Sequence, residues 1–293
     1  MADLSVIILT KDEKLHIKRC LERLMSLEPR QVFVVDCFSA DGTRAIVESF
    51  ASKLATSHYP LTTSDNRLPT SDCRLATNIS VVEHAWPSNQ AAQFNWALDN
   101  LPIETEWILR LDADEYLTQK SIAWLNAHLD SIAESVGALE FTLERNFMGG
   151  IIRHGTNSIP MVRMFRRGHG RYADTLMDER IVFDGEALSV PVVFYDDNLN
   201  TLAWWKEKHR SYAKREALQA LSGSFPDPRK AAYYKLPPYL RAFAYFIVRY
   251  FIKGGFLDGL AGWRWHFWQG LWYRWLVDIE IGKLKRRRQL QNP

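Results

Sequence analysis

Three carboxylate side chains lie within four consecutive residues, directly after the apolar run 107–111. They belong to Asp112, Asp114 and Glu115. Like charges this close repel one another unless a cation or a proton neutralises them. Carboxylate oxygens suit Mg²⁺ or Mn²⁺, which typically bind one or two carboxylates together with substrate phosphates and water. The pattern therefore predicts a divalent metal ion at these carboxylates.

Polar residues also stand at the ends of two earlier apolar runs. The run 4–10 ends in Thr10, and the run 32–35 is followed by Asp36 and, five residues later, by Asp41. In an open parallel sheet, ligands bind beyond the carboxyl ends of the strands. We therefore expect Thr10, Asp36 and Asp41 at one ligand-binding edge of a sheet.

Alternating strand-like and helix-like apolar periodicity predicts the α/β sheet that positions these residues. Strands are expected at 4–10, 32–35, 80–83 and 107–111, and helices at 11–27, 44–50, 91–101 and 121–132. Residues 56–78 are expected to form a long loop, either a lid or an insertion. Further strands at 138–145, 161–166, 180–183 and 188–195 predict a mixed second half of the sheet. The domains are expected to be 1–198 and a helical region at 199–293.

Composition excludes several classes of protein. The chain has 293 residues, 47% of them hydrophobic, which is enough for a sizeable core. Its net charge of +3 is too small to indicate nucleic-acid binding, so no nucleic-acid partner is expected. Three cysteines without paired spacing, Cys20, Cys37 and Cys73, fit a reducing cytoplasm. The first apolar run is expected to be a strand and not a signal peptide, because no basic region precedes it.

Aromatic residues crowd the segment 239–275 and alternate with arginine and lysine. A membrane-spanning helix needs about 20 mostly apolar residues, and charges interrupt this segment too often for that. We therefore expect amphipathic helices in the interface of an anionic membrane, with Trp268 and Trp272 at headgroup depth and a basic tail after 282. The alternative is that these rings form a dimer interface or pack on the first domain.

Four segments in order resemble the family 2 glycosyltransferases of the GT-A fold: VIILTKDEKLHIKRCL, VFVVDCFSADGT, NQAAQFNWALDN and WILRLDADEYLT. Later segments, among them RNFMGG, IRHG, RMFRRGHG, DERIVFDG and WWKEKHRSYAKREA, are similar to a bacterial subgroup that builds lipopolysaccharide cores, capsules and exopolysaccharides. The resemblance covers nearly the whole chain. It implies a GT-A mixed sheet flanked by helices, with an aromatic-rich helical C-terminal region. It also implies an inverting, metal-dependent transfer from a nucleotide sugar, with a UDP-sugar favoured.

The resemblance also implies roles for individual residues. Asp112 would contact the ribose or the metal, and Asp114 would coordinate the metal that bridges the two phosphates. The residues implied in nucleotide-sugar binding are Thr10, Glu13, Asp36, Asp41, Asn89, Gln90, Asn95 and Asp112. Asp41 could instead cap the following helix, and Gln90 and Asn95 could be ordinary surface positions of a helix.

An inverting transfer needs a base that accepts the proton of the acceptor hydroxyl. By resemblance this base is Glu179, in an acidic dipeptide with Asp178, where the subgroup commonly has His-Glu. Asp174 is the second candidate, and a surface turn is the structural alternative. Arg153, His154 and Arg163 are expected to contact the acceptor or phosphates, since guanidinium groups match phosphate geometry.

These features predict a glycosyltransferase at the cytoplasmic face of the membrane, acting on a lipid-linked saccharide or a lipopolysaccharide or capsule acceptor. Two rival functions remain. A sugar-phosphate nucleotidyltransferase shares the fold and the carboxylate chemistry, although the chain lacks a Gly-rich N-terminal phosphate loop. A noncatalytic membrane-bound adaptor would bind nucleotide without transferring sugar.

Overall fold

The computed structural model describes most of the chain, in two compact units. The first unit is Met1–Leu143 with Ile159–Asp197, and the second is Glu144–Ser158 with Asn198–Pro293. The described residues are 2–57, 77–87, 89–156, 159–173, 180–223 and 228–291. Most of the predicted loop at 56–78, and the acidic residues Asp174, Asp178 and Glu179, lie outside this part of the chain.

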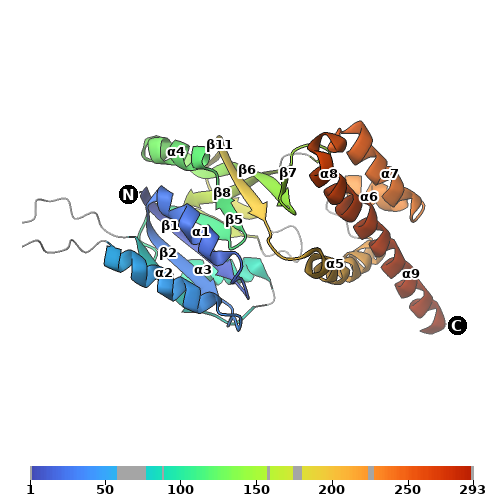
Figure 1. Cartoon of the computed structure of the whole chain (residues 1–293), viewed down its shortest axis with the longest axis horizontal. Helices are drawn as coiled ribbons and strands as arrows, with labels where there is room; N and C mark the ends of the chain where they lie inside the picture. The colour runs from blue at the N-terminus through green and yellow to red at the C-terminus, as the bar shows by residue number, and fades with distance from the viewer. Residues whose placement is uncertain are drawn as a thin grey trace, which may run out of the picture. The chain divides into compact units, whose positions relative to one another are not determined.

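A mixed β-sheet forms the centre of the first unit (Figure 1). Its strand order is β3-β2-β1-β4-β8-β6-β11-β5. The four parallel strands are β1 (Ala2–Thr10), β2 (Pro29–Asp36), β3 (Asn78–Glu83) and β4 (Trp107–Asp112). The others are β5 (Glu115–Leu117), β6 (Val136–Phe147), β8 (Ile159–Arg166) and β11 (Glu186–Asp197). β8 runs antiparallel to β4 and β6, and β11 runs antiparallel to β5. The predicted mixed sheet is thus present.

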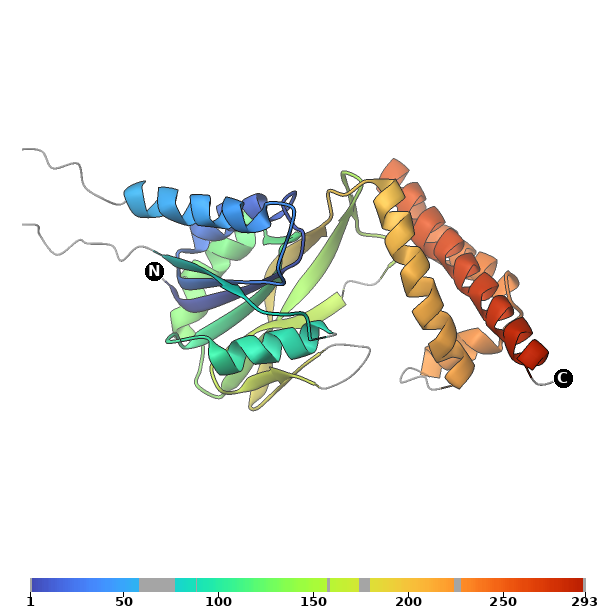
Figure 2. The same cartoon turned by 90° about the horizontal axis from the view of Figure 1, so that it is seen from below.

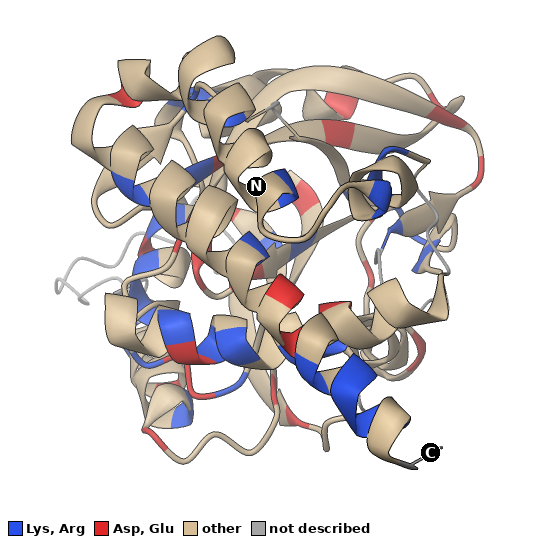
Figure 3. Ribbon diagram, turned by 90° about the vertical axis from the view of Figure 1, so that its right-hand side faces the viewer, with Lys and Arg blue, Asp and Glu red and all other residues tan. Residues whose placement is uncertain are grey.

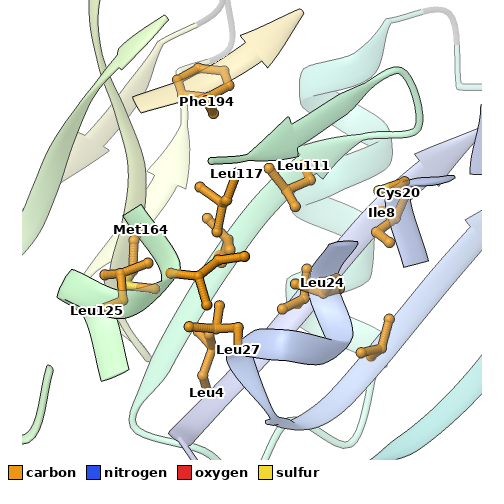
Figure 4. Packing of buried hydrophobic residues seen from close by; sticks show 14 of the residues in the cluster. Leu4, Ile8, Cys20, Leu24, Leu27, Leu111, Leu117, Leu125, Met164 and Phe194 are labelled. Carbon is orange, nitrogen blue, oxygen red and sulfur yellow. The ribbon is translucent and has the colours of Figure 1, made fainter. Parts of the chain in front are cut away.

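Helices cover both faces of this sheet because β1 is apolar on both sides. Val6 and Ile8 point to one face and pack with residues of α1 (Ile17–Leu24), α2 (Thr43–Ser57) and α4 (Gln119–His128), as Figure 4 shows for part of this cluster. Ile7 and Leu9 point to the other face, toward α3 (Gln90–Asn100) and the small sheet of β9 (Gly170–Tyr172) and β10 (Ile181–Phe183). Figure 2 shows α2 and α3 on opposite faces of the sheet. Strands with two buried faces read as continuous apolar runs.

The first helix begins at Ile17, six residues later than the predicted start at Lys11. Asp12 has a φ of 56°, in the left-handed region that interrupts a helix. The backbone N–H groups of Glu13 and Lys14 bind side chains at the start of α2 and in the loop before it: Thr43 Oγ1 at 2.8 Å and Asp41 Oδ2 at 3.0 Å. These long-range bonds replace a first helical turn.

The second unit is helical. It contains α5 (Leu202–Ser222), α6 (Pro228–Lys235), α7 (Leu240–Ile247), α8 (Gly259–Trp265) and α9 (Tyr273–Gln291). Short irregular helices η3 (Val248–Ile252), η4 (Gly255–Asp258) and η5 (His266–Trp272) connect them, and β7 (Gly150–Ile152) pairs with the end of β6. α5 and α9 lie side by side in both views (Figures 1 and 2) and share a core. Exposed lysines and arginines at the end of α9 are blue in Figure 3.

Many aromatic and basic residues of this unit belong to its own interior. Buried Glu216 accepts hydrogen bonds from Tyr273 at 2.6 Å, Tyr234 at 2.9 Å and Arg274 at 2.7 Å. Burial raises the pKa of Glu216, but Arg274 and the two hydroxyl groups lower it overall. Charged groups that are buried must be paired in this way to be tolerated. Part of the aromatic pattern that predicted membrane contact is therefore structural.

His266 makes the second unit sensitive to acid. The ring is fully buried, and its Nε2 contacts the His154 carbonyl oxygen at 3.2 Å. Burial together with Arg249 lowers the pKa of His266 to about 4, against smaller opposing effects of the His154 carbonyl and Asp258. In the unfolded chain the pKa of a histidine is about 6.5. The contribution of neutral His266 to the free energy of unfolding is therefore fully present above pH ~6.5 and is lost as the pH falls toward ~4. The loss is up to roughly 3 kcal/mol.

We expect urea unfolding to show this loss between pH 7 and pH 4.5, and His266→Gln to remove part of that slope, since burial also lowers the pKa of His209 in α5 to about 4. His128→Gln, on the exposed end of α4, serves as the control because it should leave the slope unchanged. An equal slope in the wild type and in His266→Gln would contradict the assignment.

Candidate functional site

The carboxyl ends of three parallel strands bring the predicted polar residues together. Thr10 at the end of β1 is in register with Asp36 at the end of β2. On the other side of β1, Leu9 is in register with Asp112 at the end of β4. The pairing follows from the apolar runs, which end in a polar residue at the same edge of the sheet. This edge is where ligands bind in open α/β sheets.

Thr10 and Asp36 form the base of this edge and are both buried. Thr10 Oγ1 donates to Asp36 Oδ1 at 2.9 Å. The other carboxylate oxygen of Asp36 accepts the backbone N–H of Ser39 at 2.8 Å, and the Ser39 hydroxyl donates to Oδ1 at 2.6 Å. The carboxylate thus shapes the loop after β2.

Glu13 and Asp41 lie in the two loops that follow β1 and β2. Glu13 Oε2 contacts the Nδ1 atom of buried His16 at 2.5 Å. Asp41 Oδ1 accepts the N–H of Thr43, the first residue of α2, at 2.9 Å and the Thr43 hydroxyl at 2.6 Å. Burial raises the pKa of Asp41, but these bonds and the Lys14 N–H lower it overall. Asp41 therefore makes the bonds expected of a residue that caps α2 and joins the two loops.

The segment Asp112–Asp114 forms a tight connection between β4 and β5, and β11 fastens it. The backbone N–H of Asp197 donates to the Asp114 carbonyl at 3.0 Å. Arg19 of α1 donates to the Asp197 carboxylate at 2.6 Å, and Tyr116 donates to the same carboxylate at 3.3 Å. The side chains of Asp112 and Asp114 are half-buried. A connection held from both sides keeps the two carboxylates in a fixed position.

Glu115 is the buried member of the acidic triplet. Arg163 on β8 donates to its Oε1 at 2.6 Å, and the Asp112 N–H donates to its Oε2 at 2.9 Å. Burial raises the pKa of Glu115 to about 8, against the opposing effect of Arg163. Arg163, which we expected to contact acceptor or phosphates, is itself buried and lies over the Phe194 ring at 4.9 Å.

Arg110 is a residue of this edge that the sequence reasoning missed. It donates to Asp112 Oδ1 at 3.0 Å, to Gln90 Oε1 at 2.8 Å and to the Tyr172 hydroxyl. Burial lowers its pKa, but Asp112 and Tyr172 raise it overall, so it is a permanent cation. A signal was present, since an arginine inside the apolar run WILRLD calls for a buried partner.

The remaining predicted residues on α3 have defined structural contacts. Asn89 is the N-cap of α3, and its Oδ1 accepts the Ala92 N–H at 2.6 Å. Asn95 bonds both backbone groups of Tyr172, at 2.9 and 3.0 Å, and so ties α3 to β9. Gln90, through Arg110, is linked to Asp112.

Arg153 and His154 belong to the second unit. Their backbone N–H groups both donate to Asp258 Oδ2, at 2.9 and 2.8 Å, and His154 Nδ1 contacts Asp258 Oδ1 at 2.6 Å. Both side chains are exposed. Their predicted contact with an acceptor remains a prediction, as does the role of Asp178 and Glu179.

The donor atoms at the sheet edge fit a hard divalent cation. Within the ranges that the structure describes, no three His, Cys, Asp or Glu side chains form a metal site by themselves. Asp112 and Asp114 supply carboxylate oxygens on one fixed, half-buried connection. Mg²⁺ and Mn²⁺ are commonly held by such a pair only together with substrate phosphates. The residues therefore fit a metal ion that binds with its substrate.

The sheet order and the acidic strand end define a GT-A type fold, as predicted. Residues 5–137 match the family described as Glycosyl transferase family 2, so this part of the chain is similar to the family 2 glycosyltransferases. No curated protein matches the chain significantly.

One of two similar solved structures supports the fold. A mannosyltransferase from Pyrobaculum calidifontis, in complex with GDP-Man and Mn²⁺, is similar with a TM-score of 0.50 and 17% identity over 95% of this chain and 86% of that chain. TarS 1-349 from S. aureus, in complex with UDP-GlcNAc, has a TM-score of 0.46 and 16% identity over 89% of this chain and 76% of that one.

Proposed function

We propose that the chain is an inverting glycosyltransferase that uses a nucleoside diphosphate sugar, with a UDP-sugar favoured, and Mg²⁺ or Mn²⁺. The observation that carries this proposal is the fixed Asp112–Asp114 connection beside Thr10 and Asp36 at one sheet edge. The match of residues 5–137 to the family 2 glycosyltransferases supports the sugar-transfer chemistry. In this proposal 1–198 is the catalytic domain, and 199–293 is a helical region that associates with a membrane.

In the transfer, an acceptor hydroxyl oxygen bonds to the anomeric carbon while the bond from that carbon to the diphosphate oxygen breaks. The acceptor proton goes to a carboxylate base, for which Glu179 is our candidate. A metal ion bound at Asp112 and Asp114 would neutralise the charge of the departing diphosphate. Arg110 positions Asp112, and Asp197 with Arg19 positions the Asp114 backbone.

We further propose that the acceptor is a lipid-linked saccharide or a lipopolysaccharide or capsule precursor at the cytoplasmic face of the membrane. The basic end of α9 and the aromatic C-terminal helices support this location, since such surfaces favour anionic lipid. Arg153 and His154 are the proposed acceptor contacts.

A thermal-shift screen of nucleoside diphosphates and their sugars, with and without Mn²⁺, tests the donor site, because a ligand stabilises the fold that binds it. The screen should include GDP-sugars, since the similar mannosyltransferase was solved with GDP-Man. We expect metal-dependent stabilisation and, with acceptor, release of nucleoside diphosphate. Release of pyrophosphate would instead identify a nucleotidyltransferase, and binding without any transfer would identify an adaptor.

Arg110→Met tests the positioning of Asp112. We expect Mn²⁺-dependent nucleotide binding to weaken by roughly 10-fold or more, because Asp112 loses a charge-assisted hydrogen bond. Calorimetric titration at several Mn²⁺ concentrations measures the effect, and Arg110→Lys should restore part of it.

The matched control for this variant is Arg171→Met, which removes an exposed arginine paired with Asp99 at 2.7 Å. Exposed pairs contribute at most about 1 kcal/mol, and this one does not reach the sheet edge. Equal Mn²⁺ dependence in Arg110→Met and in the wild type would refute the positioning role.

A further inference from the structure

An exposed apolar surface in the second unit has no partner in the described residues of that unit. We call η3, η4 and most of α8, residues 248–263, the apolar tip. Ile252 is 74% exposed and Leu257 is 62% exposed, which is far more than a core residue allows. The other large apolar side chains exposed here are Val248, Phe251, Phe256, Leu260 and Trp263. Contiguous apolar surfaces of this kind mark interaction sites.

Contacts between its own residues hold the apolar tip in a defined conformation. The Tyr250 ring contacts Phe251 at 5.0 Å, Phe256 at 6.3 Å and Trp263 at 5.6 Å, which joins the exposed rings into one surface. Gly254, with a φ of 72°, turns the chain between η3 and η4. These contacts keep the apolar side chains exposed in a defined arrangement.

The charged residues in and near the tip indicate which kind of partner binds its apolar surface. Residues 228–277 contain eight lysines and arginines, but Arg241, Arg249 and Arg274 are buried or paired inside the unit. The exposed cations of this segment are Arg229, Lys235 and Lys253, and its single acidic residue is Asp258. The Asp258 carboxylate is only 5% exposed, because it accepts the N–H groups of Arg153 and His154. Lys253 at the tip is exposed. The exposed Lys253 among aromatic and aliphatic side chains, with no exposed carboxylate in the tip, complements an anionic bilayer, where rings lie at headgroup depth and cations face phosphates.

A second copy of the chain fits this surface less well. Two tips face to face would bring Lys253 toward its own copy, with no exposed carboxylate between 228 and 277 to neutralise it. No described helix is long and apolar enough to cross a membrane. The surface therefore suits shallow insertion.

Trp268 and Trp272, which we expected to contact lipid, also take part in the internal packing of the second unit. Both are half-buried: Trp268 packs on the cluster of Phe147 and Trp265 with Lys206 above its ring at 4.4 Å, and Trp272 contacts Trp205 at 6.1 Å. Replacing them would disturb internal packing, so they are unsuitable for testing lipid contact.

The tip also holds the segment that we propose contacts the acceptor. The Gly155 N–H donates to the Lys253 carbonyl at 3.0 Å, and Arg249 Nε donates to the Gly155 carbonyl at 3.0 Å. Gly155 has a φ of 73°, and a Cβ atom there would meet the Arg249 carbonyl and the His266 ring. Together with the Asp258 bonds, these contacts make Arg153 and His154 part of the same rigid element.

We propose that the apolar tip inserts into the headgroup region of an anionic phospholipid bilayer and so holds Arg153 and His154 next to an acceptor anchored in that bilayer. The second half of this inference rests on the proposed function, whereas the docking itself does not.

Co-sedimentation with mixed phosphatidylglycerol and phosphatidylcholine vesicles tests the docking, with the full chain and the double variant Ile252→Asp/Leu257→Asp. We expect the variant to lose at least ~10-fold in vesicle affinity, since each side chain gives up the burial of a large apolar group. Lys253→Glu should weaken binding to these vesicles several-fold and have little effect with phosphatidylcholine alone.

Leu218→Asp is the matched control, since Leu218 is 53% exposed on α5 of the same unit. It should sediment with vesicles like the wild type. Nucleotide-dependent thermal shift of each variant reports separately on the donor site, so an inactive donor site with intact vesicle binding would refute only the proposed function. Wild-type binding that is absent, or equal in the double variant, overturns the docking inference. The docking inference is also overturned if the wild type is a dimer that does not bind vesicles and the double variant is a monomer.

Discussion

Asp114→Asn is expected to abolish metal-dependent transfer, by ~10³-fold or more, while the fold stays intact. A neutral amide cannot balance a divalent cation as the charge of the leaving diphosphate grows, and such electrostatic stabilisation is usually the largest catalytic contribution. The bond that fixes this position to β11 is accepted by the backbone carbonyl of Asp114, so the substitution keeps it.

The measurement is nucleoside diphosphate release with increasing Mn²⁺, together with thermal unfolding of the variant. Asp130→Asn, at an exposed position of the 3₁₀ turn after α4, is the control for losing one negative charge. Near-normal turnover in Asp114→Asn would show that Asp114 does not coordinate the metal ion.

Glu179→Gln is expected to retain donor binding but to lose transfer by roughly 10²-fold or more, the usual scale for a missing general base. The glutamine has nearly the same size but cannot accept the proton of the acceptor hydroxyl. This choice rests on the motif resemblance, because Glu179 lies outside the described residues.

Asp178→Asn and Asp174→Asn are the comparisons for this prediction. Calorimetry with nucleoside diphosphate and Mn²⁺ measures donor binding, and product formation measures transfer. If either aspartate variant shows the large loss while Glu179→Gln does not, the proton acceptor is that aspartate.

The strands and the acidic residues at the end of β4 could be predicted because they depend on runs of consecutive residues in the sequence. Runs such as 4–10 and 107–111 are apolar without alternation, which is typical of strands buried on both faces. The structure has strands at both places, and each ends in its polar residue at Thr10 and Asp112. Parallel pairing then places these ends at one edge, so this part of the candidate site followed from sequence order alone.

Other features depended on contacts between residues far apart in the chain. The late start of α1 is caused by bonds from Glu13 and Lys14 to the start of α2 and the loop before it, which helical periodicity does not register. Likewise, the partners that hold the Asp112–Asp114 connection are Arg19 and Asp197, which are 178 residues apart. Local patterns carry no information about such pairs.

The sequence by itself determined the α/β character of the first half, the polar ends of its strands and the aromatic, basic character of the C-terminal helices. Only the tertiary structure decided which of those rings are buried and which are exposed. Trp268 and Trp272 are half-buried against the cores of the second unit, whereas Phe251, Ile252 and Leu257 remain exposed. It also placed residues 144–158 with the C-terminal helices. The physical reason is that composition sets how favourable burial is for a side chain, but the neighbouring helices decide whether that burial occurs within the chain or against a partner.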